Sequence, residues 1–193
     1  YYPITPHNSL LKDFKKNNYD ISYYYGCYRD RDRYDKFLKT NEVEKIFIPE
    51  QGNVDEEIYN LMHENNRWGI DDKELFDIVV RDRQSSDNDK PFVDIVMTLS
   101  THEPFIILEG QEKYEQKARE IFEKANVKST KEKNIIQKNM NVFACYLYMD
   151  ECINELINSY KRMGKYDNTI FIITGDHRMG MLNTGSTLRS FNV

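Results

Sequence analysis

The sequence is poor in the residues that interrupt regular structure or cross-link a small fold. Its 193 residues include 8 glycines, 5 prolines and 3 cysteines. Cys27, Cys145 and Cys152 cannot form a disulfide framework, and none belongs to a Cys-x-x-Cys zinc-binding pattern. Cys145 and Cys152 fall on one face of an expected helix, so we expect them to be buried thiols.

Long apolar runs and a basic surface are also missing. No stretch approaches the roughly 20 apolar residues that span a bilayer, and no signal-peptide pattern is present. The formal net charge is −5, with basic residues scattered among acids, so we expect no nucleic-acid partner. The chain begins at YYPITP without a methionine, and we therefore expect a fragment of a longer parent protein.

Patterns typical of strands and helices alternate along the chain. Ser9, Asp55 and Asp71 are expected helix caps. The expected helices cover 10–18, 33–41, 56–66, 72–84, 112–125 and 141–164, and the expected strands cover 19–25, 44–49, 91–100 and 169–174. The last helix carries an apolar stripe formed by Val142, Cys145, Met149, Ile153, Leu156 and Tyr160. This alternation predicts an α/β sandwich with a mainly parallel sheet, in which 91–99 and 169–174 are central strands.

Candidate site residues follow these two strands. His102 comes after the first strand, and Asp176 and His177 come directly after the second. Ligands gather at the carboxyl ends of parallel strands, so we expect the three side chains to share one crevice. A bound metal would explain the Asp-His pair, and a structural pair or a helix cap is the alternative. For His102 the alternative is an imidazole that bonds to a loop carbonyl.

Several motifs of the chain resemble the sulfatase-like domains of the alkaline phosphatase superfamily. The segments are TLSTHEPF at 98–105, GKYDNTIFIITGDHRMG at 164–180, RWGIDDKELFD at 67–77 and the helix-strand-helix region that starts at SLLKDF. The branch that they resemble most contains the lipoteichoic acid synthases and related phosphoglycerol and phosphoethanolamine transferases. The resemblance covers most of the chain in the family's order, so residues 1–193 are expected to be a partial sulfatase-like catalytic domain.

The resemblance implies chemistry on a phosphoester or sulfate ester in an α/β/α fold. Asp176 and His177 match two metal ligands, and His102 matches a histidine that contacts the substrate's phosphate or sulfate. Manganese is the expected metal, with calcium and zinc as alternatives. The parent is expected to be a membrane-anchored bacterial enzyme with an extracytoplasmic catalytic domain. Its expected substrate is a phospholipid head group or a sulfated or phosphorylated glycan.

The chain departs from the family's pattern at both ends. The family's nucleophile and a further acidic ligand precede the matched region, and further strands follow it, so we expect the fragment alone to be inactive. Tyr25 stands where the transferase branch has a histidine, which weakens the inference about substrate contacts there. Three alternatives remain: a true sulfatase acting on sulfated glycans, another metalloenzyme of the superfamily such as a phosphomutase, and a non-catalytic α/β binding module.

Overall fold

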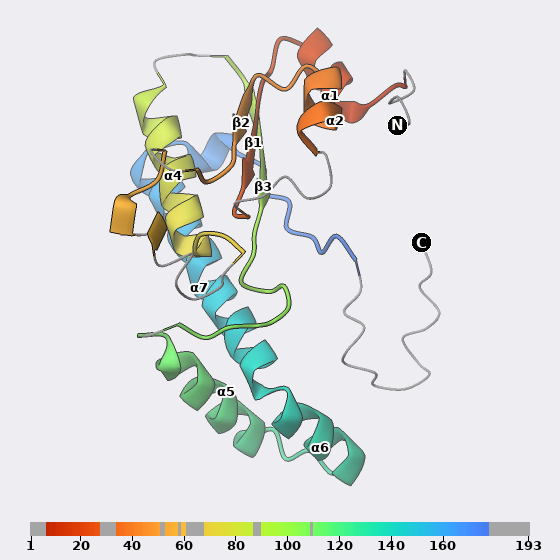
Figure 1. Cartoon of the computed structure of the whole chain (residues 1–193), viewed down its shortest axis with the longest axis vertical. Coiled ribbons are helices and arrows are strands. Elements are labelled where there is room, and N and C mark those ends of the chain that lie inside the picture. Colours follow the sequence, from red (N-terminus) through yellow and green to blue (C-terminus); the bar gives the residue numbers. More distant parts are fainter. Residues whose placement is uncertain are drawn as a thin grey trace.

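The strands that the structure describes form one parallel sheet in the order β2–β1–β3 (Figure 1). The computed structural model describes residues 7–27, 34–50, 53–57, 59–60, 68–86, 90–108 and 110–177. The strands are β1 (Asp20–Tyr25), β2 (Lys45–Phe47) and β3 (Phe92–Met97). Tyr23 of β1 lies opposite Ile46 of β2 and Ile95 of β3, so β1 is paired on both sides.

The helices account for most of the remaining described residues. They are α1 (Leu10–Lys16), α2 (Tyr34–Thr40), α4 (Asp72–Ser85), α5 (Glu112–Lys124), α6 (Thr130–Lys138) and α7 (Met140–Arg162), followed by a short 3₁₀ turn, η1 (Tyr166–Asn168). The part of the expected helix 56–66 that covers residues 58 and 61–66 lies outside the described residues. None of the helices that the structure describes combines the length and apolarity needed to cross a bilayer.

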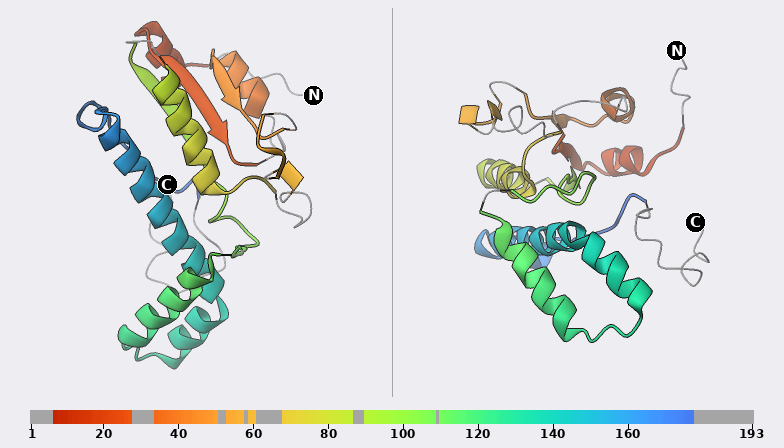
Figure 2. Two further views of the ribbon diagram at one scale, coloured as in Figure 1. Left: turned by 90° about the vertical axis from the view of Figure 1, so that its left-hand side faces the viewer. Right: turned by 60° about the horizontal axis from the view of Figure 1, so that its bottom comes forward.

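Both faces of the sheet are covered by helices, as the expected α/β/α architecture requires (Figure 2). Successive side chains of a strand point to opposite faces. Ile21 and Tyr23 accordingly pack with Leu38 and Val43 near α1 and α2. Tyr24 lies in the other cluster, formed with Ile70, Leu75, Ile78 and Val79 around α4. The expectation of an α/β fold with a parallel sheet is confirmed.

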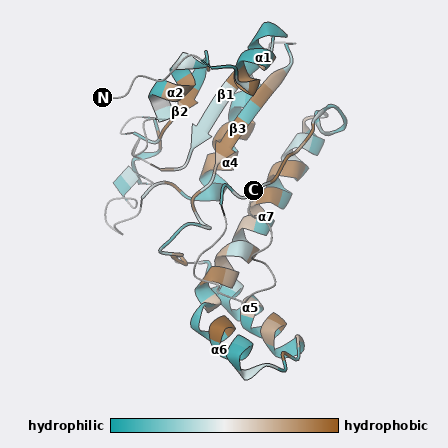
Figure 3. Ribbon diagram, turned by 90° about the vertical axis from the view of Figure 1, so that its right-hand side faces the viewer, coloured by the Kyte–Doolittle hydropathy of each residue, from teal (hydrophilic) through white to brown (hydrophobic). Residues whose placement is uncertain are grey.

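A third cluster joins α4, α5 and α7 beyond the sheet. Its buried members are Phe76, Tyr114, Ala144, Tyr148, Met149 and Cys152. Hydrophobic and hydrophilic stretches both appear along the α7 ribbon (Figure 3), and its buried residues Cys145, Met149 and Cys152 recur every three or four positions, as on one side of a helix. Of the stripe predicted for this helix, Val142, Cys145, Met149 and Tyr160 are buried, whereas Ile153 and Leu156 are half-buried. Cys145 and Cys152 are buried, as expected, and Cys27 is buried as well.

The expected strand at 169–174 is wrong for this structure. The segment runs past β3 without joining the described sheet (Figure 1). Ile170, Ile172 and Ile173 are exposed by 89%, 84% and 67%. β3 is also not central, because among the described strands it pairs with β1 alone and its residues are only half-buried. An apolar pattern shows that a segment can be buried in a sheet, but it does not supply the neighbouring strand.

Candidate functional site

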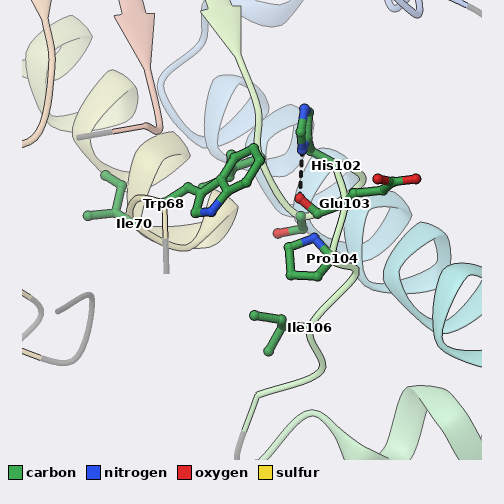
Figure 4. A pocket seen from close by; sticks show the side chains of 8 residues that line it. Trp68, Ile70, His102, Glu103, Pro104 and Ile106 are labelled. Atoms are coloured by element: carbon green, nitrogen blue, oxygen red, sulfur yellow. Dashed lines mark hydrogen bonds between the residues drawn. The ribbon is translucent and has the colours of Figure 1, made fainter. Parts of the chain in front are cut away.

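His102 lies in a tight loop just beyond the carboxyl end of β3, where the sequence placed it (Figure 4). Its backbone N–H donates to the carbonyl of Leu99 at 2.9 Å, and its own carbonyl accepts from Phe105 at 3.0 Å. Phe105 is buried against Val142 and Cys145, which anchors the far end of the loop. The imidazole of His102 remains exposed between these two anchors.

The tautomer of His102 follows from its one close polar contact. Its Nδ1 lies 2.7 Å from the carbonyl oxygen of Glu103. A carbonyl only accepts hydrogen bonds, so Nδ1 carries the proton. Nε2 is then an acceptor in the neutral ring and a donor in the protonated ring. The alternative in which His102 bonds to a loop carbonyl is therefore realised at Nδ1, while Nε2 is left for another role.

Trp68 forms the opposite wall of a pocket beside His102 (Figure 4). The two ring centroids are 4.9 Å apart, and the rings are inclined by 51°. The pocket is lined by Trp68, Ile70, Leu99, Ser100, His102, Glu103, Pro104 and Ile106. Sequence reasoning noted the motif around Trp68 but gave that residue no role. No spacing rule connects it to His102, which is 34 residues away in the chain.

A close approach of two backbone segments places Trp68. Cys27 and Gly69 form an isolated antiparallel bridge, and the N–H of Ile70 donates to the carbonyl of Gly26 at 2.9 Å. A Cβ atom at Gly69 would lie 1.8 Å from the Gly26 oxygen. Only glycine allows this contact, so Gly69 holds the Trp68 segment against the carboxyl end of β1.

Asp72 holds the end of β3. This first residue of α4 is fully buried, and its two carboxylate oxygens accept from the N–H groups of Leu99 at 2.7 Å and Ser100 at 2.9 Å. Burial raises the pKa of the Asp72 carboxyl, and the hydrogen bonds from Leu99 and Ser100 oppose that rise. This contact could not be predicted from the sequence, because the partners of Asp72 are 27 and 28 residues away.

Asp176 and His177 lie side by side on the segment that follows η1. The backbone N–H of His177 donates to the Asp176 carboxylate at 2.8 Å, and Nε2 of His177 is 3.8 Å from the other carboxylate oxygen. The side chains are exposed by 66% and 73%, respectively, so they are not buried in helix packing. The structure thus brings His102 together with Trp68, and Asp176 together with His177. A single crevice for both pairs stays a prediction.

The donor set of Asp176 and His177 fits a divalent metal as a partial site. A carboxylate oxygen and an imidazole nitrogen on adjacent residues suit manganese or zinc, whereas calcium prefers oxygen ligands. Over the described ranges, no group of three or more His, Cys, Asp or Glu side chains is arranged to hold a metal ion. The two residues therefore supply only part of a complete ligand shell.

Fold and site together define an α/β/α protein with candidate ligand-binding residues at the carboxyl edge of its sheet. The chain belongs to the Sulfatase family, whose model matches residues 2–190. It is 25% identical over 168 residues to the lipoteichoic acid synthase of Staphylococcus saprophyticus, which covers 84% of this chain. It is 32% identical over 87 residues to the lipoteichoic acid synthase of Staphylococcus aureus strain USA300, which covers 45% of this chain and 11% of that protein.

A solved structure supports the fold. The lipoteichoic acid synthase LtaP from Listeria monocytogenes aligns with a TM-score of 0.51 and 16% identity, over 81% of this chain and 34% of that chain. At this level of identity the likeness concerns the fold alone. The chain spans only 22% of the length of the Staphylococcus saprophyticus relative, so what the whole protein does is a matter for proposal.

Proposed function

We propose that this chain is part of the catalytic domain of a metal-dependent enzyme that transfers or hydrolyses phosphoester-linked head groups. The observation that carries the proposal is the exposed imidazole of His102 beside the Trp68 pocket, in a chain of the Sulfatase family. The similarity to lipoteichoic acid synthases favours a phosphoglycerol or phosphoethanolamine head group over a sulfate ester. The parent is then a membrane-anchored bacterial protein with its catalytic domain outside the cytoplasm.

His102 binds the anionic group of the substrate in this proposal. Because Nδ1–H is directed to the Glu103 carbonyl, Nε2 is the ring nitrogen that can contact a ligand. In the protonated ring Nε2–H donates to a non-bridging oxygen of a phosphoester or sulfate ester. A charge-assisted bond of this kind strengthens as negative charge grows on that oxygen in the transition state.

Asp176 and His177 hold the divalent metal in this proposal, with manganese first and zinc or calcium as alternatives. When bound, such a metal polarises the transferred group and neutralises part of its charge. The exposure of both side chains leaves room for the additional ligands that a complete shell needs. None of His102, Asp176 and His177 is a nucleophile in this proposal, and the family resemblance implies a nucleophile that precedes the matched region, so we expect the 193-residue chain by itself to turn over neither ester.

The test is a metal-titrated assay of the full-length parent with a phosphoglycerol or phosphoethanolamine lipid and, in parallel, an aryl sulfate. We expect Asp176→Asn to abolish turnover, because it removes a negative charge from the metal site. His102→Ala is expected to lower kcat about 10²- to 10³-fold while metal binding is retained. Asp167→Asn is the matched control, because Asp167 is an exposed acid nine residues before Asp176.

Each result of this assay is informative. Metal-dependent turnover of the lipid, lost in Asp176→Asn and kept in Asp167→Asn, supports the proposal. Turnover of the aryl sulfate alone identifies a true sulfatase. Full activity of Asp176→Asn without added metal contradicts the metal role. A parent that turns over neither ester and binds no divalent metal contradicts the proposed enzyme and favours the non-catalytic binding module.

A further inference from the structure

Asp72 is a buried carboxylate directly beneath the loop that presents His102. Its side chain is fully shielded from solvent. A buried Asp is rare in proteins and needs hydrogen-bond partners, which Asp72 finds in the backbone after β3. We propose that Asp72 is the positioning residue of the site, which holds the backbone after β3 so that the His102 imidazole faces the Trp68 pocket. This inference rests on the proposed role of His102 as the group that binds the substrate anion.

The position of Asp72 follows from where the strand ladder ends. The last backbone bond between β1 and β3 runs from the N–H of Gly26 to the carbonyl of Met97. Beyond it, the N–H groups of Leu99 and Ser100 need new acceptors, because an unpaired buried N–H is costly. The two oxygens of Asp72 accept one N–H each, at 2.7 and 2.9 Å.

The same contact extends directly to His102. Leu99 donates its N–H to Asp72 and accepts the N–H of His102 at its own carbonyl, at 2.9 Å. Leu99 therefore takes part in both bonds, in one through its N–H and in the other through its carbonyl. The loop is fixed at its start by Asp72 and at its end by buried Phe105, and His102 lies between these anchors.

Both walls of the pocket depend on one short segment, residues 68–72. Trp68 supplies the aromatic wall, Gly69 fixes that segment against β1, and Asp72 fixes the loop that carries His102. The separation of the two rings, 4.9 Å between centroids, is thus set by residues only four positions apart. The Asp72 carboxylate bonds to the loop that carries His102, whereas the contact that places Trp68 against β1 is made by Gly69.

A carboxylate is the only small side chain that satisfies both N–H groups. Asparagine has the same shape, but its NH₂ group would face an N–H donor and one bond would be lost. The N-terminus of α4 also favours a negative charge at this position, which offsets part of the cost of burial. The neighbouring Asp71 caps α4 through the N–H of Lys73 and accepts from Gln111 and Tyr148, with no bond to the His102 loop among its described contacts.

The first measurement is a double-mutant cycle on the full-length parent with the phosphoglycerol lipid. We expect Asp72→Asn to lower kcat/KM about 10- to 100-fold, because the histidine is displaced. The double variant Asp72→Asn/His102→Ala is expected to lose no more than His102→Ala alone, because Asp72 acts through His102. Asp71→Asn is the matched control. Any loss of kcat/KM that it causes should multiply with the loss caused by His102→Ala, because Asp71 does not act through His102.

The second measurement is hydrogen exchange of the same proteins, followed in the peptide that covers residues 98–105. In Asp72→Asn we expect exchange there to be about tenfold faster, with α4 unchanged, since a bond worth about 1 to 2 kcal/mol is lost. Asp71→Asn should leave this peptide unchanged. If Asp72→Asn does not fold, Asp72→Ser takes its place, because a hydroxyl keeps one acceptor for the two N–H groups, and effects in the same directions are expected.

The outcomes separate this inference from the proposed function. If His102→Ala keeps full activity, the proposed role of His102 is wrong, and the exchange data alone decide whether Asp72 orders the loop. If His102→Ala is impaired and the losses of Asp72→Asn and His102→Ala multiply, Asp72 is not a positioning residue. Unchanged exchange at 98–105 in Asp72→Asn overturns the inference in either case.

Discussion

At the scale of single residues, Gly69 makes the most specific demand on the sequence. A methyl group there would meet the Gly26 carbonyl oxygen at 1.8 Å, and that backbone cannot move away easily because it ends β1. A Cβ at Gly26, in contrast, would meet the side chains of Leu99 and Leu75 at 3.5 and 3.6 Å, which are ordinary contact distances. Two glycines that face each other therefore have unequal roles.

The first prediction concerns this pair. Gly69→Ala should destabilise the chain by about 1 to 3 kcal/mol, because overpacking against backbone forces the segments apart. It should also move Trp68, the only tryptophan of the chain, and so change its fluorescence emission. Gly26→Ala, the matched control, should have a much smaller effect on both urea unfolding and fluorescence. Equal losses for the two variants would show that the contact does not constrain the fold.

Local contacts are the ones that the sequence predicts well at this scale. Ser9 and Asp71 cap their helices as expected, with bonds to Lys12 and Lys73. Asp55 likewise bonds to the N–H of Glu57. These bonds span two or three residues, so composition and spacing suffice to find them. The role of Asp72 depends on partners 27 residues away, which only the folded chain brings near.

At the scale of elements, one buried ion pair ties the layers together. Arg83 of α4 forms a bidentate pair with Asp94 of β3, with its Nε 2.7 Å from one carboxylate oxygen, and donates to Ser22 of β1 at 3.1 Å. Tyr160 of α7 lies 3.5 Å from the same carboxylate. Burial raises the pKa of Asp94, and Arg83 opposes that rise. The network connects α4, β3, β1 and α7 around the carboxylate of Asp94 and the guanidinium of Arg83.

The second prediction is that Arg83→Ala destabilises the chain by about 3 to 5 kcal/mol, because Asp94 is left buried without its counter-charge. Arg81→Ala is the matched control on the same helix. Arg81 is exposed by 65% at its side chain and pairs with Glu74, so its loss should cost less than about 1 kcal/mol. Urea unfolding of the three proteins measures both values. Similar midpoints for the two variants would mean that the buried network contributes nothing.

Elements were predicted best where one segment carries its own pattern. The stripe of α7 was predicted largely correctly, because buried residues recur along one side of that helix. β1 and β3 were placed by their continuous runs of apolar and aromatic residues, and their burial does not alternate. Sequence reasoning missed α6, a helix of 9 residues in which Ile135 and Ile136 are the only large apolar side chains and none of the residues is buried. It also assigned 169–174 to the sheet from its isoleucines, although membership of a sheet depends on a neighbour that the pattern does not contain.

At the scale of the whole molecule, the chain is a member of the Sulfatase family, and its being a partial catalytic domain stays a prediction. It covers 22% of the length of the Staphylococcus saprophyticus relative and matches the Sulfatase model over residues 2–190. The exposed isoleucines at 170, 172 and 173 belong to the segment that carries Asp176 and His177. The place of those two residues after an apolar run made them candidates, and the family resemblance implied their role as metal ligands, because an Asp-His pair there has a structural explanation as well.

The central claim is that Asp176, His177 and His102 form one site at the carboxyl edge of the sheet. The most direct test is a crystal structure of the parent protein grown with manganese, with the metal located by its anomalous scattering. The account predicts a peak at about 2.0 to 2.3 Å from the Asp176 carboxylate and the His177 imidazole, with Nε2 of His102 turned toward the same crevice. Manganese bound elsewhere, with Asp176 and His177 bonded only to protein groups, or His102 on the opposite edge of the sheet, would contradict it.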